Sequence, residues 1–199
     1  PRVRKLSFTG STDVGRKLSL RASVTSALSL DDVRLPASAM LPEARGLRGP
    51  LSCLNEARFG ILFGAVGAAR DCLATALGYA DTRVQFGRPI SAFQLTQKKL
   101  ADMAVALNAA MLLALHLGRL KDRHQLRPEQ VSVGKLNNVR EAIAIAHECR
   151  TILGGNGISG EYPPLRHAAN LESVRTYEGT DEVHTLVIGE TLTGRAAYR

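Results

Sequence analysis

One carboxylate near the end of the chain stands where it could act as a base. The stretch RTYEGTDEVH places Glu178 between a tyrosine and a glycine, immediately before the start of a predicted helix. Such a carboxylate has two interpretations. It is a solvated residue beside a helix start, where the helix dipole favours negative charge, or it is a general base that removes a proton from a bound substrate.

The residues that follow Glu178 are explained by helix capping. Thr180 is suited to cap a final helix, because its hydroxyl can accept a hydrogen bond from a free backbone N–H of the first turn. Asp181 and Glu182 then lie in that turn, where acidic side chains gain about 0.3–1 kcal/mol each from the dipole. Glu178 precedes the cap and gains less, so capping leaves it unexplained.

Two glycine-containing stretches could contact a phosphate or a ring. In LGGNG, Gly154 and Gly155 allow backbone N–H groups to approach a ligand closely, although a helix C-terminal stop explains the same pattern. In RVQFG, Arg83 stands near Phe86, and a guanidinium can hold a pyrophosphate through two parallel hydrogen bonds. A surface arginine without a ligand is the alternative there.

The elements that must position these residues are mainly helical. The chain has 199 residues, 45% hydrophobic and only 5% aromatic, without tryptophan, which allows a buried core and favours helices over a sandwich or barrel. Helical periodicity predicts helices at about Cys53–Thr82, Phe93–Arg123, Pro128–Leu153, Leu165–Val174 and Asp181–Arg195. Short connections between long amphipathic helices predict an antiparallel four-helix bundle over residues 53–199.

The first 42 residues have a different texture. Polar and apolar residues alternate there, which predicts two short strands at about Leu18–Ser23 and Ala27–Leu30. Residues 43–52, EARGLRGPLS, are rich in glycine and proline and are predicted to be a linker.

Composition limits the partners. The net charge of +8 is spread along the chain and is not interleaved with stacking aromatics, so nucleic-acid binding is not expected, while phosphate-rich small molecules are compatible. The longest charge-free runs fall short of the ~20 apolar residues of a membrane span, which predicts a soluble chain without membrane insertion.

Cys53, Cys72 and Cys149 lack metal-ligand spacing and are expected to be buried, reduced thiols, with no metal site.

Taken together, the motifs resemble a known family. NEARFGILFGAVGAARDCLATALGYADTRVQFGRPISAFQLTQKKLADM, then LGGNGI, then YEGTDEVH, are similar to the C-terminal half of an acyl-CoA dehydrogenase. LNEARFG, QLTQKKLADM, LGRLKD and GGNGISGEYPPLRHAANLESVRTYEGT look most like glutaryl-CoA dehydrogenases. The resemblance covers about residues 17–199. It implies the C-terminal helical bundle of that family, preceded by the closing strands of its middle β-domain.

The resemblance implies that Glu178 is the general base. It would remove the α-proton of an acyl-CoA thioester, and the β-hydrogen would leave as hydride to the flavin of FAD. The thioester oxygen would be stabilised by the backbone N–H of the base and by a flavin hydroxyl. With glutaryl-CoA as substrate, decarboxylation to crotonyl-CoA would follow.

The family's other contacts are carried over to matching positions. The implied FAD contacts are Arg83, Phe86, Gln94, Gly154, Gly155, Thr180 and Glu182. Those at Arg83 and in the glycine-rich turn would reach the FAD of a neighbouring subunit, so a homo-oligomer, a tetramer or a dimer, is implied. Asn55 and Arg58 match substrate-contacting positions, and Tyr177 is expected to line the acyl cavity.

Four further expectations complete the interpretation. The resemblance implies electron-transfer flavoprotein as the electron acceptor, and a location in the cytoplasm of a bacterium or the mitochondrial matrix of a eukaryote. Because family members are about twice as long, the alternative is a truncated, non-catalytic helical bundle that serves only in oligomerisation or is a gene remnant. Residues 3–17, VRKLSFTGSTDVGRK, resemble a strand–turn–helix segment of aldehyde dehydrogenases, which suggests a junction, but one such turn without its Rossmann sheet is not expected to bind NAD.

Overall fold

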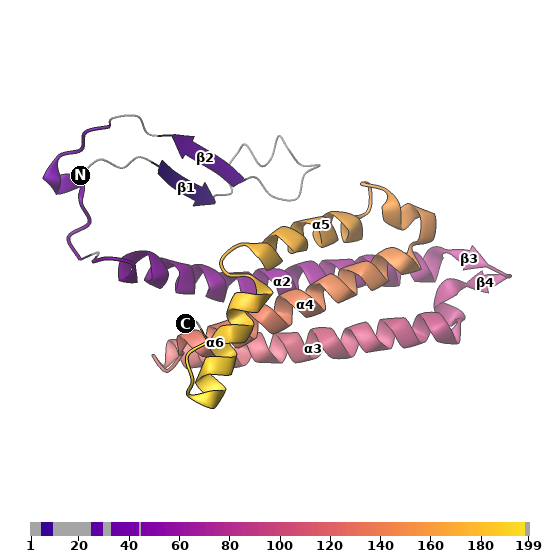
Figure 1. Cartoon of the computed structure of the whole chain (residues 1–199). Coiled ribbons are helices and arrows are strands. Elements are labelled where there is room, and N and C mark those ends of the chain that lie inside the picture. Colours follow the sequence, from indigo (N-terminus) through magenta and orange to yellow (C-terminus); the bar gives the residue numbers. More distant parts are fainter. Residues whose placement is uncertain (1–4, 10–24, 30–32, 44, 198–199) are drawn as a thin grey trace.

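Three long helices form the body of the molecule (Figure 1). The computed structural model describes residues 5–9, 25–29, 33–43 and 45–197. Each long helix runs antiparallel to the next, and two shorter helices pack on them. In order these are α2 (Arg48–Thr82), α3 (Gln94–Asp122), α4 (Pro128–Ile152), α5 (Pro163–Thr176) and α6 (Asp181–Thr193). The prediction of a mainly α, antiparallel four-helix bundle after a short β segment is confirmed.

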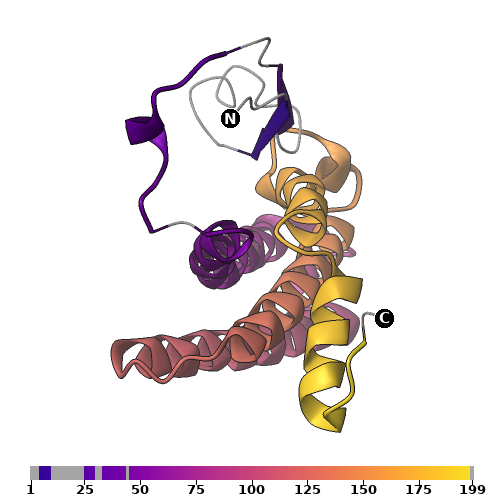
Figure 2. The ribbon, with the colours of Figure 1, turned by 60° about the vertical axis from the view of Figure 1, so that its left-hand side comes forward.

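Helix α4 is the central element, because it contacts α2, α3, α5 and α6. Its start is defined by Pro128, which has no N–H to leave unpaired in the first turn, and by Gln130, whose Oε1 accepts a hydrogen bond from the Arg127 backbone N–H at 2.9 Å. Figure 2 shows α6 lying across one side of the bundle, near α4. A side chain on the buried face of α4 is therefore held from several directions.

The helix ends agree with the predictions to within one or two residues, except at the start of α2. There the helix begins at Arg48, so the predicted linker at 43–52 is wrong for its second half. Pro50 does not prevent this, since the first-turn N–H groups of a helix have no intrahelical acceptor and a proline there loses no bond.

A tight hairpin joins α2 to α3. The two-residue strands β3 (Val84–Gln85) and β4 (Arg88–Pro89) pair antiparallel, and the turn between them has positive φ at Phe86 (51°) and Gly87 (79°). Two successive left-handed residues are typical of the turn type that closes such hairpins. Phe86 stands at the tip and is 93% exposed.

Two paired strands precede the bundle. β1 (Lys5–Thr9) and β2 (Thr25–Ser29) are antiparallel, with Lys5 opposite Ser29 and Thr9 opposite Thr25. β2 overlaps the predicted strand at Ala27–Leu30. The predicted strand at Leu18–Ser23 lies outside the described residues.

The cysteines divide into two kinds. Cys72 and Cys149 are fully buried in the core formed by α2, α3, α4 and α5, and burial raises the pKa of each thiol to about 12. Both are therefore protonated thiols at neutral pH, as predicted. Cys53 is exposed, which corrects the prediction, because it lies in the first turns of α2 where little of the described chain covers the helix.

Two helices have the length and apolar character of membrane spans. They cover Gly49–Thr82 and Gln94–Asp122, with mean hydropathy of 1.4 and 1.7 in their most apolar stretches. Core helices of soluble proteins pass the same test, and both helices pack against α4. The absence of membrane insertion stays a prediction.

A buried asparagine links the three long helices. The Asn138 side-chain amide on α4 donates to the Leu62 carbonyl of α2 at 3.3 Å and to the Ala110 carbonyl of α3 at 3.2 Å. Replacing Asn138 with alanine removes both bonds, together with the one that its Oδ1 accepts from Asn137, and leaves a void. We therefore expect a loss of about 2 kcal/mol in the free energy of unfolding, measured by chemical denaturation. As the control, Asn108→Ala on the exposed side of α3 should change it by less than about 0.5 kcal/mol. Equal effects of the two substitutions would contradict this role of Asn138.

Candidate functional site

The connection between α5 and α6 has an unusual backbone. Tyr177 ends α5 in an extended conformation, and it is followed by Glu178 with φ of 59° and Gly179 with φ of 95°. A left-handed conformation at a residue with a side chain costs on the order of 1 kcal/mol and persists only when its surroundings impose it. We call residues 177–179 the base loop.

Arg58, on α2, holds the base loop from one side. Its Nε donates to the Glu178 carbonyl oxygen at 2.6 Å, and its Nη1 donates to Asn55 Oδ1 at 3.1 Å. The structure therefore brings Asn55 and Arg58 next to Glu178, although about 120 residues separate them in sequence. The predicted base and the two predicted substrate-contacting residues therefore lie together. Tyr177, the residue expected to line the acyl cavity, precedes Glu178 in the chain.

Lys135, on α4, holds the base loop from the other side. Its ammonium donates to the Tyr177 carbonyl oxygen and, at 2.6 Å, to the Gly179 carbonyl oxygen. The side chain is only 1% exposed. Burial, followed by the nearby Arg58 charge, lowers the pKa of Lys135 to about 8, so it is still mostly protonated at pH 7.

A histidine closes the loop from α6. His184 Nδ1 lies 3.1 Å from Ser132 Oγ, and burial, then the charges of Lys135 and Arg58, lower the pKa of the imidazole to about 4. It is therefore neutral at pH 7. A side chain at position 179 would begin 3.1 Å from His184 Nε2, and with the positive φ this makes glycine the residue that fits there.

One oxygen of the Glu178 carboxylate is left without a donor. Among the described residues, Glu178 Oε2 and His184 Nε2 are the buried side-chain polar atoms that have no hydrogen-bond partner. Native proteins rarely leave such atoms unpaired, and each one points to strain, chemistry or a missing ligand. A buried, unpaired carboxylate oxygen is suited to accept a proton.

The start of α6 agrees with the capping interpretation. Thr180 Oγ1 accepts a hydrogen bond from the Val183 N–H at 3.5 Å, and Asp181 and Glu182 lie in the first turn. The hydrogen bond from Thr180 lowers the pKa of the exposed Glu182 carboxyl. Asp181 does more than the dipole argument predicted. It is buried, and its Oδ2 accepts bonds from Arg140 at 2.9 Å and from Arg175 at 2.8 Å.

The remaining predicted cofactor residues gather at the other end of α2 (Figure 1). Arg83 and Phe86 belong to the hairpin, and Gln94 begins α3. The short 3-10 helix η3 (Gly154–Ile158) follows α4, and its Asn156 amide donates to Tyr79 Oη at 3.1 Å, near the C-terminal end of α2.

Both functions considered for the glycine-rich turn are compatible with its geometry. Gly154 has φ of 58°, as expected of a residue that ends a helix, and both Gly154 and Gly155 are exposed with open space where a side chain would stand. At about 1.5 Å of helical rise per residue, Arg58 and Arg83 lie roughly 35–40 Å apart along α2. The predicted cofactor residues therefore form two groups, one near Glu178 and one at the hairpin end.

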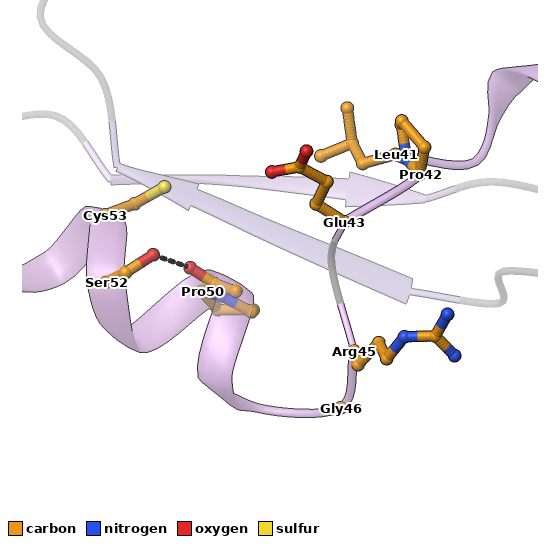
Figure 3. A pocket seen from close by; sticks show the side chains of 9 residues that line it. Leu41, Pro42, Glu43, Arg45, Gly46, Pro50, Ser52 and Cys53 are labelled. Atoms are coloured by element: carbon orange, nitrogen blue, oxygen red, sulfur yellow. Dashed lines mark hydrogen bonds between the residues drawn. The ribbon is translucent and has the colours of Figure 1, made fainter.

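A separate hollow of about 830 Å³ lies between the segment that precedes α2 and the first turns of that helix (Figure 3). Leu41, Pro42, Glu43 and Cys53 are among its lining residues, and Ser52 Oγ there donates to the Gly49 carbonyl at 2.7 Å. It contains none of the predicted site residues, so its size alone does not make it the candidate site.

The sequence reasoning missed Lys135, His184 and the pairing of Asp181. A signal for Lys135 was present, because the charged side chain falls on one helical face with the apolar residues Val131, Val139 and Ala142. A charged residue on such a face must be compensated by partners elsewhere in the fold. No local pattern identified those partners, since they lie on the base loop, more than 40 positions along the chain.

Comparisons with known proteins identify the family. A family model described as acyl-CoA dehydrogenase, C-terminal domain, matches residues 44–193. The chain is 38% identical over 173 residues to the human mitochondrial short-chain specific acyl-CoA dehydrogenase, covering 86% of this chain and 42% of that protein.

Solved structures show the same likeness. A glutaryl-CoA dehydrogenase from Mycobacterium smegmatis in complex with FADH2 is 65% identical with a TM-score of 0.88, over 98% of this chain and 50% of that one. A chain in a structure of the electron transferring flavoprotein of Acidaminococcus fermentans is 32% identical with a TM-score of 0.82, over 87% and 46%. The chain thus spans about half the length of these relatives.

Proposed function

The chain belongs to the acyl-CoA dehydrogenase family, and from that premise we propose that it supplies the C-terminal part of an FAD-dependent acyl-CoA dehydrogenase with Glu178 as the base. The observation that carries the proposal is the Glu178 carboxylate, whose Oε2 is buried and unpaired while the backbone around it is held at three successive carbonyls. A fold that fixes the backbone so firmly and leaves the Oε2 atom without a donor keeps that oxygen available for a substrate proton.

The residues of this chain would do the following. Glu178 takes the α-proton of the thioester onto its carboxylate, and its backbone N–H donates to the thioester oxygen, where negative charge develops. Bound FAD would supply the hydride acceptor for the β-hydrogen. Neutral His184 and buried Asp181 keep the loop and the start of α6 in place.

Arg58 would hold the base loop and, together with Asn55, would contact the substrate. Two N–H groups of the Arg58 guanidinium are used on the Glu178 carbonyl and on Asn55 Oδ1. An arginine has five N–H donors, so the others are free to meet the acyl-CoA. Tyr177, half-buried beside Lys135 with 6.0 Å from its ring centroid to the ammonium nitrogen, would line the acyl cavity.

The two groups of cofactor residues support a homo-oligomer. Thr180 and Glu182 lie near the base, whereas Arg83, Phe86, Gln94, Gly154 and Gly155 lie at the hairpin end, so we propose that one chain contacts two FAD molecules, its own and that of a neighbouring subunit. The nearly fully exposed Phe86 ring is available for stacking on such a ligand. Exposed apolar side chains on α3, among them Val105, Leu112 and Leu115, provide a surface for a dimer or tetramer contact.

We propose glutaryl-CoA as the substrate, with decarboxylation to crotonyl-CoA, because the 65% identical relative is a glutaryl-CoA dehydrogenase. Electron-transfer flavoprotein is the proposed electron acceptor. The proposed location is the cytoplasm of a bacterium or the mitochondrial matrix of a eukaryote.

Flavin binding tests the proposal directly. We expect the purified chain, incubated with FAD and passed through a desalting column, to keep the visible flavin absorption band, and glutaryl-CoA to bleach it without oxygen. Butyryl-CoA in place of glutaryl-CoA tests the substrate class, and light scattering gives the oligomeric state. A chain that retains no flavin would contradict the enzyme function for this chain alone and favour the non-catalytic bundle.

A further inference from the structure

Two cations reach three consecutive carbonyl oxygens of the base loop. Lys135 takes the first and third, at Tyr177 and Gly179, and Arg58 takes the middle one, at Glu178. The two come from different helices, α4 and α2. This arrangement closes on the backbone of the loop and leaves the Glu178 Oε2 atom untouched.

The base loop needs such contacts to keep its shape. Glu178 and Gly179 both have positive φ, a combination that a glutamate adopts only when its surroundings impose it. Because a change of φ at Glu178 would swing its side chain, the position of the carboxylate depends on the carbonyl contacts. Lys135 is the better fixed of the two cations, since α4 contacts α2, α3, α5 and α6 and the side chain is buried.

A buried lysine at this position is unfavourable for the stability of the fold. Removing an ammonium from water is costly, and no described carboxylate forms an ion pair with Lys135. An apolar side chain would fill the same space without that cost. The hydrogen bonds that compensate for its burial go to the pair of loop carbonyls, one on each side of Glu178, and the nearby charges of Glu178 and Asp181 also favour the ammonium form.

We infer that Lys135 is a positioning residue, which holds the Glu178 backbone in its left-handed conformation and so aims the carboxylate. The inference rests on the proposed function only for its catalytic consequence. The contact between Lys135 and the loop is a property of the chain itself, and it can be measured without FAD or substrate.

The test compares Lys135→Met with Lys98→Met by hydrogen–deuterium exchange on the full chain. Lys98 is an exposed lysine on α3 that pairs with Asp102 at 2.5 Å, so it controls for loss of a charge. We expect Lys135→Met to raise exchange in a peptide spanning 177–184 by at least tenfold, while a peptide from α3 stays within twofold of the parent. Lys98→Met should change neither. If Lys135→Met does not unfold cooperatively, Lys135→Gln, which keeps an N–H donor, replaces it with a smaller expected increase.

Loop exchange within twofold of the parent in the variant, or a uniform rise across all peptides, would overturn the inference. In a chain that binds FAD, Lys135→Met should also lower kcat for flavin reduction by about tenfold or more while KM changes by less than threefold, because the base is misplaced and substrate binding is not. Looser exchange in a protein without dehydrogenase activity would sink the proposed function and keep the positioning role. Unchanged exchange in an active enzyme would do the reverse.

Discussion

Replacing Glu178 with glutamine is expected to reduce flavin bleaching by acyl-CoA by about 10³-fold or more, because an amide cannot accept the α-proton. Glutamine has nearly the same shape as glutamate, and no described group donates to the Oε2 atom that is lost, so the fold should tolerate the change. FAD binding should persist, since the loop is held through its backbone carbonyls. The measurement is anaerobic stopped-flow of the flavin band in a preparation that retains FAD.

Glu172→Gln is the matched control for this experiment. Glu172 is an exposed glutamate on α5, six positions before the base, and its replacement should leave the bleaching rate within twofold of the parent. A Glu178→Gln protein that bleaches as fast as the Glu172→Gln protein would refute the assignment of the base.

Replacing Gly157 with alanine is expected to lower the free energy of unfolding by about 3 kcal/mol, a large effect for one methyl group. The added Cβ would lie 2.1 Å from the Arg150 carbonyl oxygen and 2.9 Å from its carbon. Both are backbone atoms of the last turn of α4, so they cannot rotate away as a side chain would. For a chain of this size, such a loss corresponds to a fall in Tm of roughly 6–12 °C, measured by calorimetry.

Gly155→Ala supplies the comparison within the same short 3-10 helix. A Cβ at position 155 meets nothing within 4 Å, and the backbone there is compatible with alanine. The expected change is within about 0.5 kcal/mol, measured without FAD so that a cofactor contact does not contribute. If the two variants melted together, the tight packing of η3 against α4 would be refuted.

In the base loop, the backbone is held by many contacts while the Glu178 side chain has few. Its backbone is strongly restrained, by Arg58 and Lys135, while its side chain has an unpaired oxygen. Local strain of this kind is common at functional sites, where the surrounding structure sustains it. Glu178→Gln changes the side chain and leaves the backbone contacts in place. Lys135→Met removes backbone contacts and leaves the Glu178 side chain unchanged.

Much of the fold could be predicted from the sequence because helical periodicity and turn residues are local signals. Pro128 marked the start of α4, and the glycines at 154 and 155 marked its end. The start of α2 was misplaced because Pro50 is a helix breaker in most positions and is harmless in a first turn. The hairpin was predicted only as a loop, since two-residue strands carry almost no pattern.

The candidate site could be predicted in part. Glu178, Asn55, Arg58 and Tyr177 were assigned from the motifs that resemble the family, and the structure brings them together. The motifs did not indicate that the Arg58 side chain donates a hydrogen bond to the Glu178 carbonyl, or that Asp181 is paired with two arginines. These contacts join different parts of the fold. A sequence pattern shows which helix a residue belongs to, but not which residues of other helices it contacts.

By itself, the sequence determined which segments are helices, which face of each is apolar, and which glutamate the capping of α6 could not explain. These properties depend on residues within a few positions of one another, through hydrogen bonds and side-chain spacing along a single helix. Only the tertiary structure decided that Lys135 and Arg58 meet at Glu178, that its Oε2 is buried without a donor, and that the cofactor residues lie at two ends of α2. The reason is that a buried charge is tolerated only where packing supplies partners, and that packing is a property of the whole bundle.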